Sequence, residues 1–297
     1  MTAPLPYAGV SGLVSRTEVL AALSAFPACG RQLMVGVLAS EKTLAGQQNR
    51  WHRRYPRVEN IAGIFADDPR CLNLMHFGAD TPPDGDTLAR LFELAGPRCH
   101  GFQFNGAWPY NPEIRTLRRL FERAGREPRI VLQAGPHVLG ACPTSLDLVM
   151  RVSAYADAGI ATDILIDASA GRGEPLHVDL AEFRRRDLLD AFPHLGVGVA
   201  GGLSAEMVMV PRVARLLQSG ASCDAEGKLR DGADGGGRLM QEKVAAYLEA
   251  TVAAVREARC VACDDPVPAD AKALGWSYGT FVDGNAVWLC PDCKPLE

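Results

Sequence analysis

The stretch Leu195-Gly196-Val197-Gly198-Val199-Ala200-Gly201-Gly202-Leu203-Ser204-Ala205-Glu206 contains a complete passage from strand to helix. Its first half is short and apolar, which predicts a buried strand, and the two glycines that follow allow a sharp turn. Ser204 is a residue type that caps helices, and Glu206 falls in the first turn, so we expect a helix over Ala205–Gln218. The stretch therefore predicts one β/α unit of a parallel sheet.

The same alternation continues on both sides of this unit. Strands are predicted at Tyr7–Leu13, Gln32–Ala39, Cys71–Phe77, Cys99–Asn105, Arg129–Ala134, Asp163–Asp167, Leu195–Ala200 and Ala221–Asp224. Helices are predicted at Arg16–Phe26, Thr87–Ala95, Pro112–Ala124, Ser145–Ala158, Leu180–Ala191, Ala205–Gln218 and Met240–Arg256. An open doubly wound sheet shows the same alternation, but the strand count and the lack of a G-x-G-x-x-G after the first strand favour closure. We expect an α/β fold, a (β/α)8 TIM barrel over residues 1–258.

The last forty residues carry a different signal, two C-x-x-C pairs separated by 26 residues. The pairs are Cys260 with Cys263 and Cys290 with Cys293. This spacing is typical of a four-cysteine zinc ribbon, and a segment this short needs a metal to fold. Two disulfides or four core cysteines are the alternatives. We expect residues 259–297 to bind structural Zn2+, because four cysteines leave no open coordination position for catalysis.

Composition limits the partners of the chain. Its 297 residues have a net charge of −4, and residues 259–297 hold three basic and six acidic side chains, so no nucleic-acid binding is expected. No apolar run is long enough to span a bilayer, and no signal peptide is evident. Nine cysteines, five of them isolated, favour the cytoplasm. The sequence leaves open whether the protein forms a homo-oligomer or binds a protein partner through the ribbon.

Polar side chains stand at the ends of several predicted strands, where a parallel barrel carries its chemistry. They are Gln103, Asn105, Gln133, Asp167 and Asp224. Such residues also cap helices or bind loop backbone, but together they predict a polar pocket. Gly201 and Gly202, next to a helix start, are suited to binding a phosphate.

Several of these segments resemble phosphoribosylanthranilate isomerase over most of residues 7–250. They are Ile164–Asp167, Gly171-Arg172-Gly173, Ala200–Ser204 and the strand that contains Asp224. The resemblance implies a small phosphorylated substrate, no organic cofactor, and an Amadori rearrangement in which one acid opens a sugar ring and one base removes a proton.

Carried over by residue, the resemblance implies that Asp167 is the general acid and that Gly201 and Gly202 hold the phosphate. It also implies that Arg54, followed by Tyr55, faces the substrate. Phe102–Gly106 is similar to the family's Gln-Leu-His-Gly, with Asn105 in place of the histidine.

The sequence departs from the family at two strand ends. Ser11, in Gly9-Val10-Ser11-Gly12, stands where the family has its basic cysteine, and Asp224-Ala225-Glu226-Gly227 replaces Asp-Val-Ser-Ser-Gly. An alcohol is a much weaker base than a thiolate.

Asp224, His76 and His137 are candidates to replace this base. Two alternatives to an isomerase remain. One is a lyase or aldolase with Lys42 as nucleophile, and the other is a non-catalytic barrel that binds a metabolite.

Overall fold

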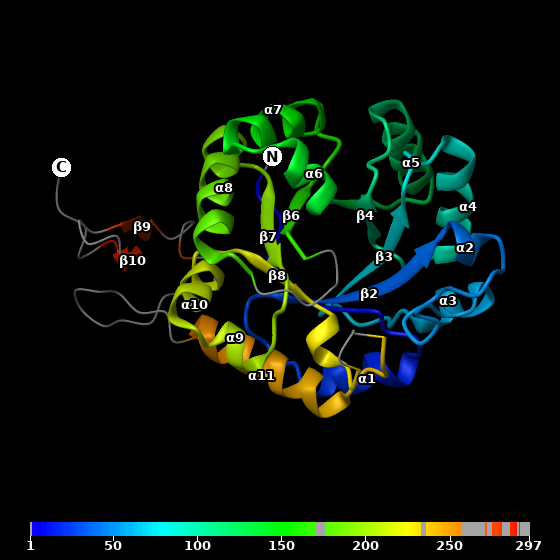
Figure 1. Ribbon diagram of the computed structural model, residues 1–297, viewed down its shortest axis with the longest axis horizontal. Coiled ribbons are helices and arrows are strands. Elements are labelled where there is room, and N and C mark those ends of the chain that lie inside the picture. Colours follow the sequence, from blue (N-terminus) through cyan, green and yellow to red (C-terminus); the bar gives the residue numbers. More distant parts are fainter. Residues whose placement is uncertain are drawn as a thin grey trace.

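The computed structural model describes residues 2–169, 176–232, 236–256, 271, 275–280, 286–289 and 291. Its centre is a closed barrel of parallel strands in the order β1 to β8, with helices around the outside (Figure 1). The strands are β1 Tyr7–Ser11, β2 Gln32–Ser40, β3 Cys71–Ala79, β4 Gly101–Gly106, β5 Arg129–Ala134, β6 Asp163–Asp167, β7 Gly196–Ala200 and β8 Ser222–Ala225. All eight predicted strands are confirmed, and the open-sheet alternative is wrong because β1 pairs with β8.

The α-helices are α1 Arg16–Ser24, α2 Glu41–Leu44, α3 Ile61–Ile64, α4 Gly85–Ala95, α5 Asn111–Arg123, α6 Pro136–Ala141, α7 Ser145–Ala156, α8 Val178–Ala191, α9 Ala205–Val208, α10 Pro211–Gln218 and α11 Gln241–Arg256. The 3-10 turns η1 Val58–Asn60 and η2 Gly227–Leu229 complete the described elements of the barrel. The prediction of one helix over Ala205–Gln218 is wrong. The helical segment is interrupted before Pro211, because proline has no N–H for the helical hydrogen bond and Val210 is extended. The one-turn helices α2, α3 and α6 are too short to leave a periodic pattern in the sequence.

The strands alternate between two apolar cores. Phe102, Phe104, Ile164 and Ile166 pack outward against the helices, as the period of two predicted. A smaller core fills the middle of the barrel with Tyr7, Met34, Leu72, Leu74, Val131, Leu165 and Ala200. The interior is therefore a packed plug, and polar inward-facing residues are confined to its two ends.

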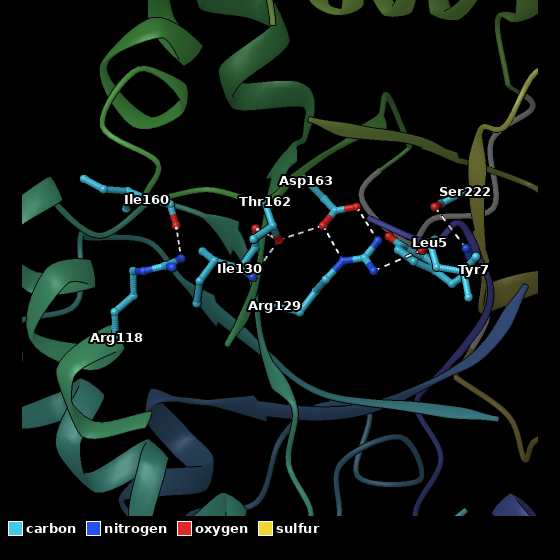
Figure 2. A network of polar contacts seen from close by, with 9 residues as sticks. All are labelled: Leu5, Tyr7, Arg118, Arg129, Ile130, Ile160, Thr162, Asp163 and Ser222. Atoms are coloured by element: carbon cyan, nitrogen blue, oxygen red, sulfur yellow. Dashed lines mark hydrogen bonds and ion pairs between the residues drawn. The ribbon is translucent and has the colours of Figure 1, made fainter. Parts of the chain in front are cut away.

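At the amino end of the strands, a polar network closes the barrel floor (Figure 2). Arg129 Nε donates to Asp163 Oδ2 at 2.5 Å, and Nη2 donates to Asp163 Oδ1 at 2.7 Å. The third guanidinium nitrogen, Nη1, donates to the carbonyl of Leu5 at 3.0 Å, and so holds the segment before β1. Gly196 leaves room for this pair, because a Cβ there would lie 2.1 Å from Asp163 Oδ1. The floor is a structural ion pair shared by β5 and β6.

Beyond α11, two further strands form a separate two-stranded antiparallel sheet, β9 Ser277–Thr280 with β10 Ala286–Leu289. Cys260, Cys263, Cys290 and Cys293 lie outside the described residues. In the part of the chain that is described, no helix has the length and apolar character needed to cross a membrane.

Candidate active site

A small cavity of about 110 Å³ lies at the carboxyl end of the barrel. Every strand contributes to it, through Ser11, Leu38, His76, Gln103, Gln133, Asp167, Ala200 and Asp224. The connecting loops add Trp51, Arg54, Tyr55, Ser169, Gly201, Gly202 and Glu226. The predicted mouth residues Asn105, Gln133, Asp167 and Asp224 therefore line one cavity, with the glycine pair beside them.

Asp224 lies at the end of β8 and is buried. Ser11 Oγ donates to its Oδ1 at 2.7 Å, and Gln103 Nε2 approaches its Oδ2 at 3.5 Å. Burial raises the pKa of this carboxyl to about 7, helped by the charges of Glu226 and Asp167, while the two hydrogen bonds oppose the rise. Asp224 can therefore gain or lose a proton near neutral pH, which suits general acid–base catalysis.

Asp167 is held from three directions at the end of β6. Gln133 Nε2 donates to Oδ2 at 2.7 Å, while the N–H and the hydroxyl of Ser169 donate to Oδ1 at 2.9 and 2.8 Å. Asp167 is 3% exposed and opens into the cavity rather than toward the helices. The predicted placement of this carboxyl is confirmed.

Two glutamines connect the carboxyls. Gln103 Nε2 donates to Gln133 Oε1 at 3.0 Å, so a chain of hydrogen bonds runs from Asp224 through both amides to Asp167. Trp108 Nε1 donates to the carbonyl of Gln133 at 2.9 Å and fixes the end of β5. The two carboxyls are thus held apart on opposite sides of an amide bridge.

His76 is part of the cavity, but not as a group that titrates near neutrality. Desolvation lowers the pKa of its imidazole to about 3, so the ring is neutral at physiological pH. The expectation that its ordinary pKa suits proton transfer is therefore wrong. His137 lies exposed on α6 and Lys42 lies exposed on α2, and neither lines the cavity. The proposed desolvation of Lys42 is wrong because its side chain is exposed, whereas the lyase alternative itself stays a prediction.

The glycine pair adopts backbone conformations that other residues rarely take. Gly201 has φ 115° and Gly202 has φ 59°, and both line the cavity. Neither N–H donates to a carbonyl in the turns and loops that the structure describes. The helix after them, α9, has a single turn, and Ser204 Oγ already accepts the N–H of Met207. Any anion here would therefore bind the glycine amides rather than the helix end.

Arg54 reaches the cavity from the loop after β2. Its Nη1 lies 3.0 Å from Glu226 Oε1, and its guanidinium stacks 4.8 Å from the ring of Trp51. Trp51, Ser169 and Glu226 were not predicted as site residues. The signal for Glu226 was its spacing from Asp224, since alternate residues share one face of an extended chain. Gly171-Arg172-Gly173, which carried part of the family resemblance, lies outside the described residues.

A larger hollow of about 1060 Å³ lies at the opposite end of the barrel. Its charged floor residue Arg129 is committed to Asp163, and Arg118 lies 3.6 Å from the exposed Glu127. Both pairs are structural contacts, and neither resembles the linked carboxyls at the carboxyl end. The smaller cavity is therefore the candidate active site.

No protein-family model matches the sequence, and no curated protein matches it. Solved structures with a similar fold include the carboxyl transferase domain of Rhizobium etli pyruvate carboxylase, at 12% identity and a TM-score of 0.49, covering 84% of this chain. Dihydrodipicolinate synthase from Thermotoga maritima matches at 16% identity and a TM-score of 0.44, covering 85% of this chain and 80% of its own. Orotidine 5'-monophosphate decarboxylase from Methanocaldococcus jannaschii matches at 9% identity and a TM-score of 0.45, covering 82% of this chain and 98% of its own.

The match covers 47% of the pyruvate carboxylase chain, so this protein spans about half of that chain's length. At these identities and TM-scores the similarities do not bear on what this protein binds or converts.

Proposed function

We propose that the protein is an acid–base isomerase that converts a small phosphorylated aldose, or a phosphoribosyl amine, into the corresponding ketose. One observation carries the proposal. Asp224 and Asp167 open into the same cavity, linked by Gln103 and Gln133, and the pKa of Asp224 is raised to about 7. Paired carboxyls in different environments can act as acid and base in one reaction.

In this proposal the active form carries one proton on the carboxyl pair, held by Asp167, while Asp224 is ionised. Asp224 removes the proton from the carbon next to the substrate carbonyl. Asp167 donates a proton to the ring oxygen during ring opening and regains one from the anomeric hydroxyl, which becomes the carbonyl. It then donates that proton to the carbonyl oxygen as the enediol forms. Return of the proton from Asp224 to the neighbouring carbon, and of a hydroxyl proton to Asp167, completes the ketose and restores both residues. No proton is consumed overall.

The surroundings support a phosphorylated substrate of modest size. Among the described residues, the N–H groups of Gly201 and Gly202 offer donors for an anion at the cavity, and the Arg54 guanidinium, paired with Glu226, adds a cation at its edge. The volume of about 110 Å³ is well below the roughly 300–1,000 Å³ of sites for drug-sized ligands. A simple sugar phosphate is therefore favoured over a phosphoribosyl amine that carries an aromatic ring.

Isomerisation of ribose 5-phosphate in D2O, followed by NMR, tests the reaction through deuterium entering the product carbon. We expect Asp224→Asn and Asp167→Asn each to lower the rate by about 10²–10⁴-fold, the usual contribution of one general acid or base. Asp190→Asn, an exposed change at the end of α8, is the matched control and should keep the wild-type rate. Turnover that survives Asp167→Asn would remove the proposed acid role. Lack of turnover by the wild type, combined with binding of the probe, would favour the non-catalytic reading.

We also propose that residues 259–297 form a zinc ribbon held by Cys260, Cys263, Cys290 and Cys293. Along the chain, one C-x-x-C pair precedes β9 and the other follows β10, which is the order of elements in a ribbon. A fully thiolate site closes the metal to substrate, so the zinc would stabilise the fold of this segment.

Metal analysis of the purified protein is expected to find about one zinc per chain. Cys260→Ser should lower that content several-fold, because a ribbon with three thiolates binds zinc much more weakly. Cys29→Ser, a change at a cysteine that belongs to neither C-x-x-C pair, is the control and should leave the zinc content unchanged. Zinc-free protein with all four cysteines present would contradict the ribbon.

A further inference from the structure

His76 occupies a position in the cavity that the proposed acid–base pair leaves unexplained. It is 4% exposed near the end of β3, and its Nδ1 lies 3.3 Å from Ser11 Oγ. Its Nε2 has no hydrogen-bond partner among the described residues. The ring lies over Gly36, where a Cβ would stand 2.7 Å from the imidazole and 2.7 Å from Ser11 Oγ. A glycine at this point of β2 allows the histidine and the serine to meet.

The direction of the two hydrogen bonds of Ser11 decides the tautomer of His76. While Asp224 is ionised, the Ser11 hydroxyl donates its only proton to Oδ1 at 2.7 Å. Ser11 Oγ can then only accept from His76, so Nδ1 carries the ring proton and Nε2 is a bare acceptor.

Protonation of Asp224 reverses both bonds. Gln103 Nε2 approaches Oδ2 as a donor, so an added proton is better placed on Oδ1, facing Ser11. The carboxyl then donates to Ser11, Ser11 donates to His76 Nδ1, and the ring proton is on Nε2.

We infer that His76, Ser11 and Asp224 form a proton relay, in which a proton taken up at His76 Nε2 is matched by a proton delivered to Asp224 Oδ1. The His76 Nδ1 proton passes to Ser11 Oγ as the Ser11 proton passes to Oδ1. The serine ends unchanged, the imidazole stays neutral with its proton on the other nitrogen, and Asp224 gains one proton. As a route for a substrate proton the relay rests on the proposed function, whereas the tautomer change does not.

The charges around the relay are consistent with this exchange. Glu226 and Asp167 both act on Asp224 and raise its pKa, and Arg54 is paired with Glu226 rather than with Asp224. Tyr7 lies below Asp224 in the barrel, and Cys223 and Tyr247 are buried near it. Around His76 the facing residues are the uncharged Gly36 on β2 and Gln103 on β4. Because burial lowers the pKa of His76 to about 3, an imidazolium would not accumulate during transfer.

The relay is tested by 15N NMR of the full-length protein labelled at histidine, without substrate, from about pH 5 to about pH 9. We expect His76 to change from the Nε2–H tautomer to the Nδ1–H tautomer as the pH rises, with a midpoint near the pKa of Asp224, about 7. His100 is an internal reference, since its Nδ1 accepts the N–H of Asn73 at 2.9 Å and its neutral form must keep Nε2–H. A single His76 tautomer across this range, or a cationic ring, would overturn the inference.

Ser11→Ala and Asp224→Asn provide the second measurement. Each removes one link, so the His76 tautomer should no longer change with pH in either variant, while His100 stays as in the wild type. A change that persists in Ser11→Ala would exclude Ser11 as the connection. Because these spectra need no turnover, failure of the isomerase assay and failure of the relay are separate results.

Discussion

We expect Asp224→Asn to have a pH-dependent effect on the free energy of unfolding. Relative to the wild type, the variant should be about 4 kcal/mol more stable above neutral pH than it is near pH 4. The carboxyl has a pKa of about 7 in the folded protein, against an ordinary value of 3.8. Below both values the group is protonated in the folded and unfolded states, and burial of the neutral acid carries no charge penalty. Between pH 3.8 and about 7 the unfolded state is ionised while the folded state keeps its proton, so the wild type loses this stability progressively and the asparagine variant does not.

Urea denaturation of both proteins at about pH 4.5, 6 and 8 measures this difference in the free energy of unfolding. His76 acts in the opposite direction, since its pKa of about 3 makes the folded state less stable as the pH falls below its usual value of 6.5. That effect is present in both proteins and largely cancels when they are compared. A stability difference that is constant across the three pH values would mean that Asp224 does not titrate near neutrality.

Removing one partner of the floor ion pair should be the most damaging single change in the barrel. Asp163→Ala leaves the Arg129 guanidinium buried without its carboxylate, and we expect a loss of about 3–5 kcal/mol in the free energy of unfolding. The side chains are 2% and 10% exposed, so water can replace little of the lost interaction. Guanidinium chloride denaturation at pH 7 measures the loss.

Two controls separate the buried charge from the general effect of mutation. The double change Arg129→Met with Asp163→Leu removes both charges, and should recover most of the loss because no uncompensated charge remains. Glu127→Gln removes a surface partner of Arg118 that is 84% exposed, and should change stability by less than about 0.5 kcal/mol. A loss in Asp163→Ala as small as the surface control would show that the floor pair is not a stability determinant.

The barrel could be predicted because strand and helix periods are local properties. Each apolar run predicted its own strand, and the period of two placed Phe104 outward and Gln103 inward without knowledge of any neighbour. The strand-end rule then brought Asp167, Asp224 and the glycine pair to one end of the barrel. The break in the helix at Pro211, by contrast, was not predicted, because the residues on both sides of it follow a helical pattern.

The chemical state of the site was not accessible from the sequence, because it depends on side chains brought together from distant parts of the chain. Ser11 and Asp224 are 213 residues apart, yet their 2.7 Å hydrogen bond gives the serine a role other than that of a base. His76 and Lys42 looked equally available as lone residues, but burial neutralises one and exposure on α2 removes the other from the cavity.

The order of strands and helices and the inward-facing polar positions are properties of the linear chain, and they predict a barrel with a polar carboxyl end. The C-x-x-C spacing is also local, and it predicts a metal-binding segment beyond the barrel. Which carboxyl titrates near pH 7, which arginine is neutralised by Glu226 and which histidine stays uncharged depend on burial and on partners contributed by other strands. Desolvation and short-range hydrogen bonds set these properties, and both come into existence only when the eight strands close around a common interior.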